Sequence, residues 1–222
     1  MVVGTSYESS KKAVELAEKY DELYATVGIH PVDDPSQKFD WKNFEALITS
    51  KKVVAIGECG MDFFHADRTK DYQRQKELFQ NQIDFALKYN KPLMIHAREA
   101  YEEILQILEP VKKQYGEKLK GNVHFFAGDI VVARKFFDLG FTISFTGVIT
   151  FTHDYDEVIK LAPLNMIMSE TDSPYLTPVP NRGKRNEPAY VRKVVERIAE
   201  IRKEDEDVVR AALVNNALSM IG

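Results

Sequence analysis

The sequence predicts an α/β fold, an incomplete TIM-type β/α barrel with seven of the usual eight strand–helix units. Three observations predict it. Short β-branched or aromatic segments alternate with longer segments of helical spacing along the chain. Strand segments such as residues 53–56 are apolar on both faces, which is typical of a parallel sheet covered by helices. Histidine or carboxylate residues recur at the C-terminal ends of successive strands.

The strand prediction covers seven segments, which are residues 1–4, 23–28, 53–57, 92–96, 122–125, 141–145 and 165–169. Amphipathic spacing predicts helices over residues 9–20, 41–48, 71–89, 100–111, 188–201 and 204–221. The strand count alone also fits an open, doubly wound sheet. The polar residues at the strand ends favour a barrel. In a barrel the C-terminal ends of the strands converge on one opening, whereas in an open sheet they lie in a row.

Length and composition predict one domain over residues 1–222, because no Pro/Ser-rich linker divides the chain. Cys59 is the only cysteine, which excludes an internal disulfide and suits a reducing, cytoplasmic location. No apolar run approaches the ~20 residues of a membrane-spanning helix, so we expect no membrane association. The net charge of −4 argues against a broad basic face for duplex nucleic acid, so such contacts must be local or metal-assisted.

Four ligand-type residues stand at the ends of different strands: Glu58, His96, His124 and Asp172. Two imidazoles and two carboxylates fit a divalent ion such as Zn²⁺, Mn²⁺ or Mg²⁺. An ion at the mouth of a barrel activates water for hydrolysis, and Asp172 or Glu58 would serve as the general base. His30 stands at the end of another strand.

Ordinary structural roles compete with each of these assignments. A single strand-end histidine is more often a hydrogen-bonded rim residue than a ligand, and Glu58, which follows a glycine, could cap a helix or pair with an arginine. Four such coincidences at one rim favour the metal site. We interpret His65 and His153, in predicted loops or helix starts, as surface residues.

Several motifs resemble those of the TatD-type metal-dependent deoxyribonucleases of the amidohydrolase-like superfamily. The most specific pair is Glu-Thr-Asp-Ser-Pro-Tyr at 170–175 with Arg-Gly-Lys-Arg-Asn-Glu-Pro at 182–188. Further matching segments are residues 3–5, 25–31, 55–63, 95–99, 124–128 and 139–147. The resemblance implies a β/α barrel with one or two divalent ions that hydrolyses phosphodiester bonds, often from the 3′ end of DNA.

The resemblance also implies roles for individual residues. Glu58 would be a carboxylate able to bridge two ions, with His96 and His124 as imidazole ligands of one of them. Asp172 would be ligand or base at the other, and His30 would line the pocket near the scissile phosphate.

Two departures from the family pattern change these expectations. Phe125 stands where the family usually has Cys, which leaves the ligand His124 in place. The strand and helix that carry the family's Asp-Thr-His-x-His motif have no counterpart here. We therefore expect one firmly held ion, a weak second site and weakened activity. We also expect that unpaired edges at residues 1–4 and 165–169 lead to homo-oligomers, or that the sequence is a truncated form of a longer gene product.

Cations near the last ligand strand predict phosphate contacts by Arg182 and Arg185, with Arg98 as another candidate. A solvated turn, or a structural ion pair for Arg98, is the competing interpretation. Aromatic residues near the predicted opening could stack on the bases of a single strand, although such residues are more often core: Phe63, Phe64, Phe125, Phe126 and Tyr175. The expected partner is DNA, at single-stranded ends.

Two other functions remain open: a metal hydrolase of a small phosphoester, lactone or amide, and a non-catalytic remnant that acts as a binding module.

Overall fold

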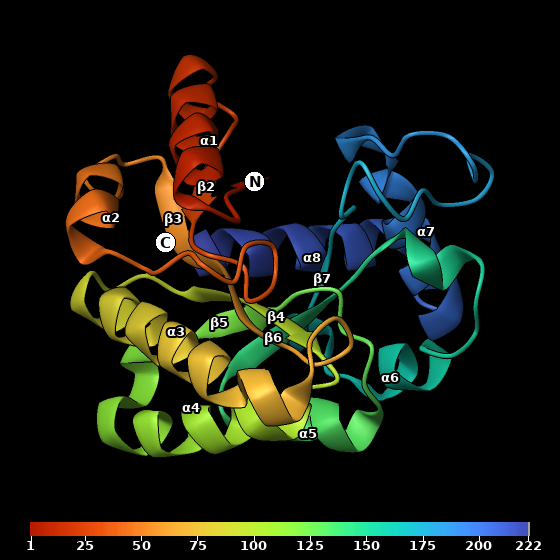
Figure 1. Cartoon of the computed structure of the whole chain (residues 1–222). Coiled ribbons are helices and arrows are strands. Elements are labelled where there is room, and N and C mark those ends of the chain that lie inside the picture. The colour runs from red at the N-terminus through yellow and green to blue at the C-terminus, as the bar shows by residue number, and fades with distance from the viewer. Residues whose placement is uncertain (222) are drawn as a thin grey trace. The chain divides into compact units, whose positions relative to one another are not determined.

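The computed structural model describes residues 1–221, and Figure 1 traces their helices and strands in chain order. The chain divides into two compact units, residues 1–122 with Ile221 and residues 123–220. Both units alternate parallel strands with helices, which confirms the expected α/β class. The expectation of one domain over residues 1–222 stays a prediction.

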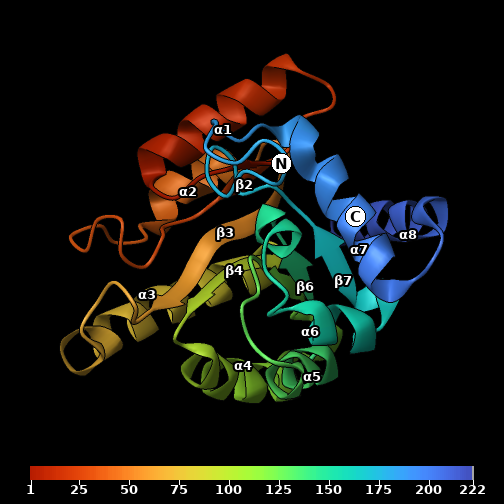
Figure 2. The same cartoon turned by 90° about the vertical axis from the view of Figure 1, so that its right-hand side faces the viewer.

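The first unit is a parallel sheet with helices between its strands. The strands pair in the order β1 (Val2–Val3), β2 (Ala25–Val27), β3 (Val53–Asp62) and β4 (Leu93–Arg98). The helices are α1 (Tyr7–Lys19), α2 (Trp41–Ile48), α3 (Arg68–Lys88) and α4 (Tyr101–Tyr115), followed by the 3-10 turn η1 (Gly116–Lys118). Helix α3 packs on β3, and α4 packs on β3 and β4, which lie side by side in Figure 2. Strand β5 (Gly121–Val123) leads on to the second unit.

Capping residues set the starts of the helices in the first unit. Ser6 forms a capping box with Ser9 at the start of α1, and the Asp67 carboxylate accepts the Thr69 N–H at the start of α3. Each cap satisfies backbone N–H groups that have no partner within the helix. Both helices therefore begin two or three residues earlier than the apolar periodicity predicts.

Strand β3 is longer than predicted, because it continues from Gly57 through Glu58 to Asp62. Two glycines permit this close pairing with β4. A Cβ on Gly57 would overlap the Met94 carbonyl, and one on Gly60 would overlap the His96 carbonyl. Both glycines also have positive φ, which other residues rarely adopt. Glu58 thus lies inside a strand, and its interpretation as a helix cap is wrong because Asp67 caps α3.

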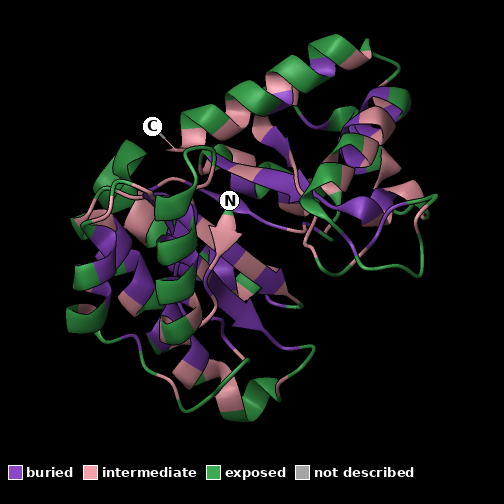
Figure 3. Ribbon diagram, turned by 90° about the horizontal axis from the view of Figure 1, so that it is seen from above, coloured by how far each residue is buried: buried purple, intermediate pink, exposed green. Residues whose placement is uncertain are grey.

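An aromatic cluster forms the core beneath α2 and α3. The ring of Phe39 stacks on Phe44 at 4.1 Å between centroids and meets Phe85 edge-on at 5.0 Å. All three side chains are buried. In Figure 3 the buried residues line the strands and the inner helix faces, while exposed residues cover the outer faces. Burial of this apolar surface anchors α3, which in turn carries polar side chains toward the site.

The second unit contains a parallel pair, β6 (Phe141–Phe145) and β7 (Ile167–Ser169). Its helices are α5 (Ile130–Asp138), α6 (Asp156–Leu161), α7 (Val191–Arg202) and α8 (Glu206–Ile221), with 3-10 turns η2 (Gly147–Thr150), η3 (Leu164–Met166) and η4 (Pro188–Tyr190). Helix α5 packs on β6, and α7 packs on β7. The sequence did not predict α5 or α6, and the helix predicted from residue 188 begins with η4 instead.

Among the helices of residues 1–221, none combines the length and the apolar character needed to cross a membrane.

The approach of β3 to β4 gives a test of this architecture. Gly60→Ala should lower the free energy of unfolding by about 2–6 kcal/mol, because overlap with the His96 carbonyl adds to backbone strain, each worth about 1–3 kcal/mol. Gly116→Ala is the matched control, since Gly116 also has positive φ but has open space around its Cβ position. Gly116→Ala should lose only the backbone-strain contribution, about 1–3 kcal/mol. Equal losses in urea titrations would contradict the role of the close approach.

Candidate metal centre

Adjacent strands bring Glu58 and His96 together. Glu58 lies in the middle of β3, and His96 lies on β4, where it pairs in register with Gly60. The backbone N–H of Glu58 donates to the Gly4 carbonyl at 2.9 Å, which ties this part of β3 to the segment after β1. The short parallel register therefore fixes the distance between a carboxylate and an imidazole.

A buried amide positions the third member, His30, on the loop after β2. Gln82 of α3 accepts the N–H of Ile29 at 2.9 Å and donates to the Ile29 carbonyl at 3.0 Å. The His30 N–H donates to the Thr5 carbonyl at 2.8 Å. The loop is thus held by hydrogen bonds on both sides, and the imidazole has a defined direction.

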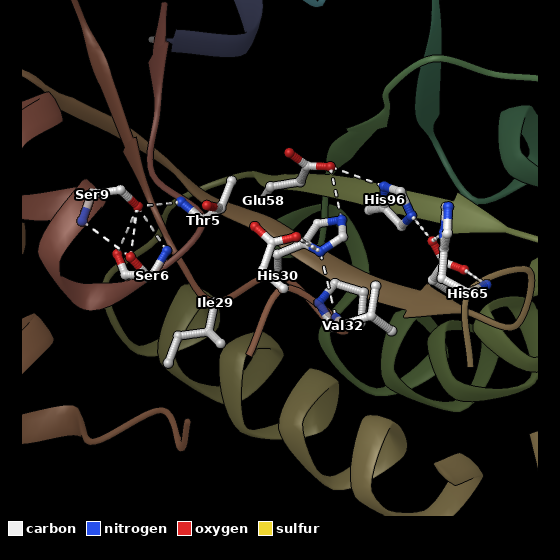
Figure 4. Close-up of polar contacts among 12 residues, drawn as sticks. Thr5, Ser6, Ser9, Ile29, His30, Val32, Glu58, His65 and His96 are labelled. Carbon is white, nitrogen blue, oxygen red and sulfur yellow. Dashed lines mark hydrogen bonds and ion pairs between the residues drawn. The ribbon is translucent and has the colours of Figure 1, made fainter. Parts of the chain in front are cut away.

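The imidazole rings of His30 and His96 both face the Glu58 carboxylate (Figure 4). Glu58 Oε1 lies 2.9 Å from His96 Nδ1 and 3.5 Å from His30 Nε2. The two rings meet edge-on, with 4.4 Å between centroids. Ligand atoms of all three residues lie within 4.8 Å of one another, so this group could hold a metal ion. Two imidazole nitrogens and a carboxylate oxygen suit Zn²⁺ or Mn²⁺, and three protein ligands are the number found in catalytic sites that keep a position open for water.

Each imidazole also has a carboxylate at its other nitrogen. His30 Nδ1 lies 2.8 Å from Asp33 Oδ1, and His96 Nε2 lies 2.9 Å from Asp62 Oδ2. Histidine ligands of metal ions usually donate their second ring N–H to a carboxylate or carbonyl in this way. The arrangement around Glu58 therefore fits a metal centre better than a set of ordinary ion pairs.

Hydrogen bonds keep both supporting carboxylates ionised. Burial on its own would raise the pKa of Asp62, but donors on His96 and His65 outweigh it and hold that pKa well below its usual range. The hydrogen bond from His30 similarly lowers the pKa of Asp33. Both groups are therefore acceptors at neutral pH.

The second unit holds the predicted ligand His124 beside Glu170, a residue that the sequence analysis did not single out. Glu170 Oε1 accepts the Phe125 N–H at 2.6 Å and the Ser144 hydroxyl at 2.8 Å. Its Oε2 lies 3.6 Å from His124 Nδ1. Burial would raise the pKa of Glu170, but His124 and these donors together lower it. Glu170 is thus the carboxylate that neighbours the His124 ring.

Asp172 lies in the loop after β7 with a left-handed backbone, at φ 52°. Its carbonyl accepts the Tyr175 N–H at 2.9 Å. The buried amide of Asn186 donates to the carbonyls of Thr171, at 2.8 Å, and Tyr175. Asn186 thereby links the two specific motifs of this region and fixes the backbone on either side of Asp172.

The structure brings together part of the predicted ligand set. Glu58 and His96 lie together as expected, and His30, predicted as a substrate contact, joins them as a third candidate ligand. His124 and Asp172 belong to the second unit, and their place at the same ion stays a prediction. Sequence reasoning missed Asp62 because it ended β3 at Gly57, although Asp62 stands within the matching segment 55–63.

The remaining histidines differ from each other. His153 is a surface residue as expected, with an exposed ring beside Asp156. His65 is also largely exposed, but its Nδ1 lies 2.8 Å from Asp62 Oδ2, so it contacts the group that supports His96.

Two of the three predicted phosphate-binding arginines, Arg98 and Arg182, have partners within their own units. The Arg98 guanidinium lies over the Phe64 ring at 4.7 Å, and Arg182 lies over the Phe151 ring at 3.9 Å. Arg182 also donates to the Thr177 carbonyl at 3.1 Å. Arg185 is exposed. Their contact with phosphate stays a prediction.

Glu170 provides a test of the second unit. Glu170→Ala should lower the free energy of unfolding by about 2–4 kcal/mol, because buried donors on Phe125 and Ser144 lose a charged acceptor. Glu170→Gln should lose less, and Glu187→Ala, on an exposed side chain, should lose little. Because folding lowers the pKa of Glu170, its contribution is full above the unfolded value and disappears as pH falls through the folded value. The deficit of Glu170→Gln should therefore shrink below pH ~4 in urea titrations, since Glu has an ordinary pKa near 4.3; a constant deficit would contradict this.

Comparison with known proteins places this site in a family. The family model described as TatD related DNase matches residues 1–222. The chain is 40% identical over 221 residues to the uncharacterized metal-dependent hydrolase YabD of Bacillus subtilis, which covers 98% of this chain and 84% of YabD. It is 34% identical to the 3'-5' ssDNA/RNA exonuclease TatD of Escherichia fergusonii, over 100% of this chain and 86% of that protein.

Solved structures agree with the sequence matches. The crystal structure of YJJV, a TatD homolog from Escherichia coli K12, superposes with a TM-score of 0.87 at 29% identity, over 99% of this chain and 84% of that chain. This match confirms the expected TIM-like α/β fold. The fold, the convergent His30–Glu58–His96 group and these relatives agree, and the chain belongs to the TatD family of metal-dependent hydrolases.

Proposed function

We propose that this hydrolase is a nuclease that removes nucleotides from the 3′ end of single-stranded DNA with the help of a divalent ion. The observation that carries the proposal is the convergence of His30, Glu58 and His96, with a carboxylate behind each ring. The name of the Escherichia fergusonii relative, a 3'-5' ssDNA/RNA exonuclease, supports the substrate class.

In this proposal the metal ligands are Glu58, His96, His124 and Asp172, with His30 as a ligand or phosphate contact. A bound ion would polarise a phosphoryl oxygen and lower the pKa of water. The Asp172 carboxylate would serve as the general base that accepts a proton from water. Glu58, between two imidazoles, would be the carboxylate ligand of the ion. One ion is held firmly and a second weakly, and Mg²⁺, Mn²⁺ and Zn²⁺ are the candidates.

The charge distribution favours strand ends over duplex DNA. A chain with a net charge of −4 gains little from contact with a long polyanion. Local cations at Arg98, Arg182 and Arg185 would instead hold the few phosphates next to the scissile bond. The proposal also places the protein in the cytoplasm, since its single buried thiol, Cys59, needs no oxidising compartment.

The first test uses single-stranded DNA labelled at its 5′ end, with Mg²⁺ or Mn²⁺. We expect stepwise shortening from the 3′ end and loss of activity in EDTA. Asp172→Asn should lower kcat by about 10²–10⁴-fold, the usual contribution of a general base. Asp34→Asn, on an exposed turn, is the control and should leave kcat unchanged. Cleavage in EDTA, or full activity in Asp172→Asn, would contradict the proposal; activity on a small phosphoester but not on DNA would assign a different substrate.

The basic loop offers a separate test. Arg185→Ala should raise KM for DNA severalfold and leave kcat nearly unchanged, because a phosphate contact contributes uniform binding. The slope of log KM against log salt should fall by about 0.7, the value for one phosphate contact on a single strand. Arg210→Ala, in which an exposed arginine paired with Asp207 on α8 is removed, is the control. An unchanged KM and salt slope would remove Arg185 from the binding site.

A further inference from the structure

Four hydrogen-bond contacts hold the buried carboxylate of Asp62. Its side chain is 0% exposed. Oδ1 accepts the backbone N–H groups of Phe64, at 3.0 Å, and His65, at 2.8 Å. Oδ2 faces two ring nitrogens, His65 Nδ1 at 2.8 Å and His96 Nε2 at 2.9 Å.

The backbone of Asp62 is fixed as well. Gln75 of α3 accepts the Asp62 N–H at 2.7 Å and donates to the Asp62 carbonyl at 2.9 Å. The same amide donates to Asp71 Oδ2 at 2.8 Å, so its orientation is defined by both contacts. Asp62 cannot turn away from His96 without breaking several buried hydrogen bonds.

This geometry selects one tautomer of His96. An ionised carboxylate can only accept, so the His96 nitrogen that faces Asp62 must carry the hydrogen. An imidazole that binds a metal ion is neutral and has one N–H, which leaves the lone pair on Nδ1, the atom 2.9 Å from Glu58 Oε1. A lone pair and a carboxylate oxygen then face the same point, which is the donor pattern of a cation site.

We propose that Asp62 is a positioning residue: it holds His96 as the Nε2–H tautomer and directs Nδ1 to the ion shared with Glu58. Asp33 contacts the His30 ring in the same way, but it determines the tautomer of that ring less firmly. The Asp33 side chain is 50% exposed, and the Val32 N–H lies 3.4 Å from the same Nδ1, a contact that requires an unprotonated nitrogen. The inference rests on the metal centre of the proposed function and is independent of the substrate.

A purely structural role for Asp62 is the competing explanation, because its Oδ1 contacts close the turn that leads to α3. The two roles differ at His96. A turn-forming aspartate would not need a particular tautomer of that ring, whereas the positioning role requires one. The test must therefore read out the ring nitrogens and the ion, besides stability.

The tautomer can be read in the unaltered protein. In ¹⁵N NMR spectra of the chain loaded with Zn²⁺, His96 should show a protonated Nε2 and an unprotonated Nδ1. In Asp62→Asn the amide NH₂ would replace Oδ2 as a donor, so the His96 hydrogen should move to Nδ1. A wild-type His96 with its hydrogen on Nδ1 would overturn the proposal, whatever the fate of the variant.

Metal affinity provides the second readout, measured by titration with Mn²⁺ or Zn²⁺ alone, without nucleic acid. Asp62→Asn should weaken binding by about 10–100-fold, the usual effect of losing such a partner, and Asp33→Asn should weaken it less. Asp34→Asn, on an exposed turn, is the control and should bind like the wild type. A folded Asp62→Asn with wild-type affinity, or a wild-type chain without affinity for either ion, would overturn the proposal.

The two proposals can fail separately. Tight metal binding that depends on Asp62, with no cleavage of DNA, would reject the nuclease and support the positioning role. Cleavage of DNA with unchanged metal affinity in Asp62→Asn would support the nuclease and reject the positioning role.

Discussion

The geometry of the metal centre depends on the close approach of β3 to β4. Gly57 and Gly60 flank Glu58, and neither could carry a Cβ without overlapping the carbonyl of a β4 residue. With side chains at these positions the strands would have to separate, and the 2.9 Å contact between Glu58 and His96 would be lost. In the segment Gly57-Glu58-Cys59-Gly60, the two glycines lack side chains and so let the backbones of β3 and β4 approach closely. This approach places the Glu58 carboxylate beside the imidazole of His96.

Helix α3 supplies the second constraint through two buried amides. Gln75 and Gln82 are seven residues apart, which places them on the same face of the helix. Gln82 holds the backbone of Ile29, next to His30, and Gln75 holds the backbone of Asp62. One helix, fixed by its aromatic packing, thus orients both sides of the centre. Buried amides whose donors and acceptors are satisfied are rigid, because any shift leaves polar groups without partners.

The sequence predicted the order of the strands and of the helices other than α5 and α6, because short apolar segments alternate with segments of helical spacing. It also predicted that Glu58 and His96 meet, since residues at the same level of neighbouring parallel strands must lie close. It failed where local signals mislead. Gly57 suggested a strand end, although its φ and its neighbour Met94 show that it belongs inside β3, and this error concealed Asp62. Helix α6, with six residues, is too short for a periodic pattern, and the role of Glu170 depends on a long-range contact with Phe125.

Each unit places a buried carboxylate beside a histidine ring. In the first, Asp62 accepts from the ring nitrogen of His96 that lies away from Glu58. In the second, Glu170 is held by Phe125 and Ser144 with its other oxygen 3.6 Å from His124. In both, a carboxylate fixed by backbone N–H groups stands beside an imidazole, and its hydrogen-bond donors lower its pKa against the effect of burial. Such a carboxylate remains ionised in a low-dielectric surrounding and raises the basicity of the ring, which strengthens a nitrogen ligand. Hydrogen bonds thus fix the carboxylate beside each of these two imidazoles, which is more than a rim histidine without a ligand would require.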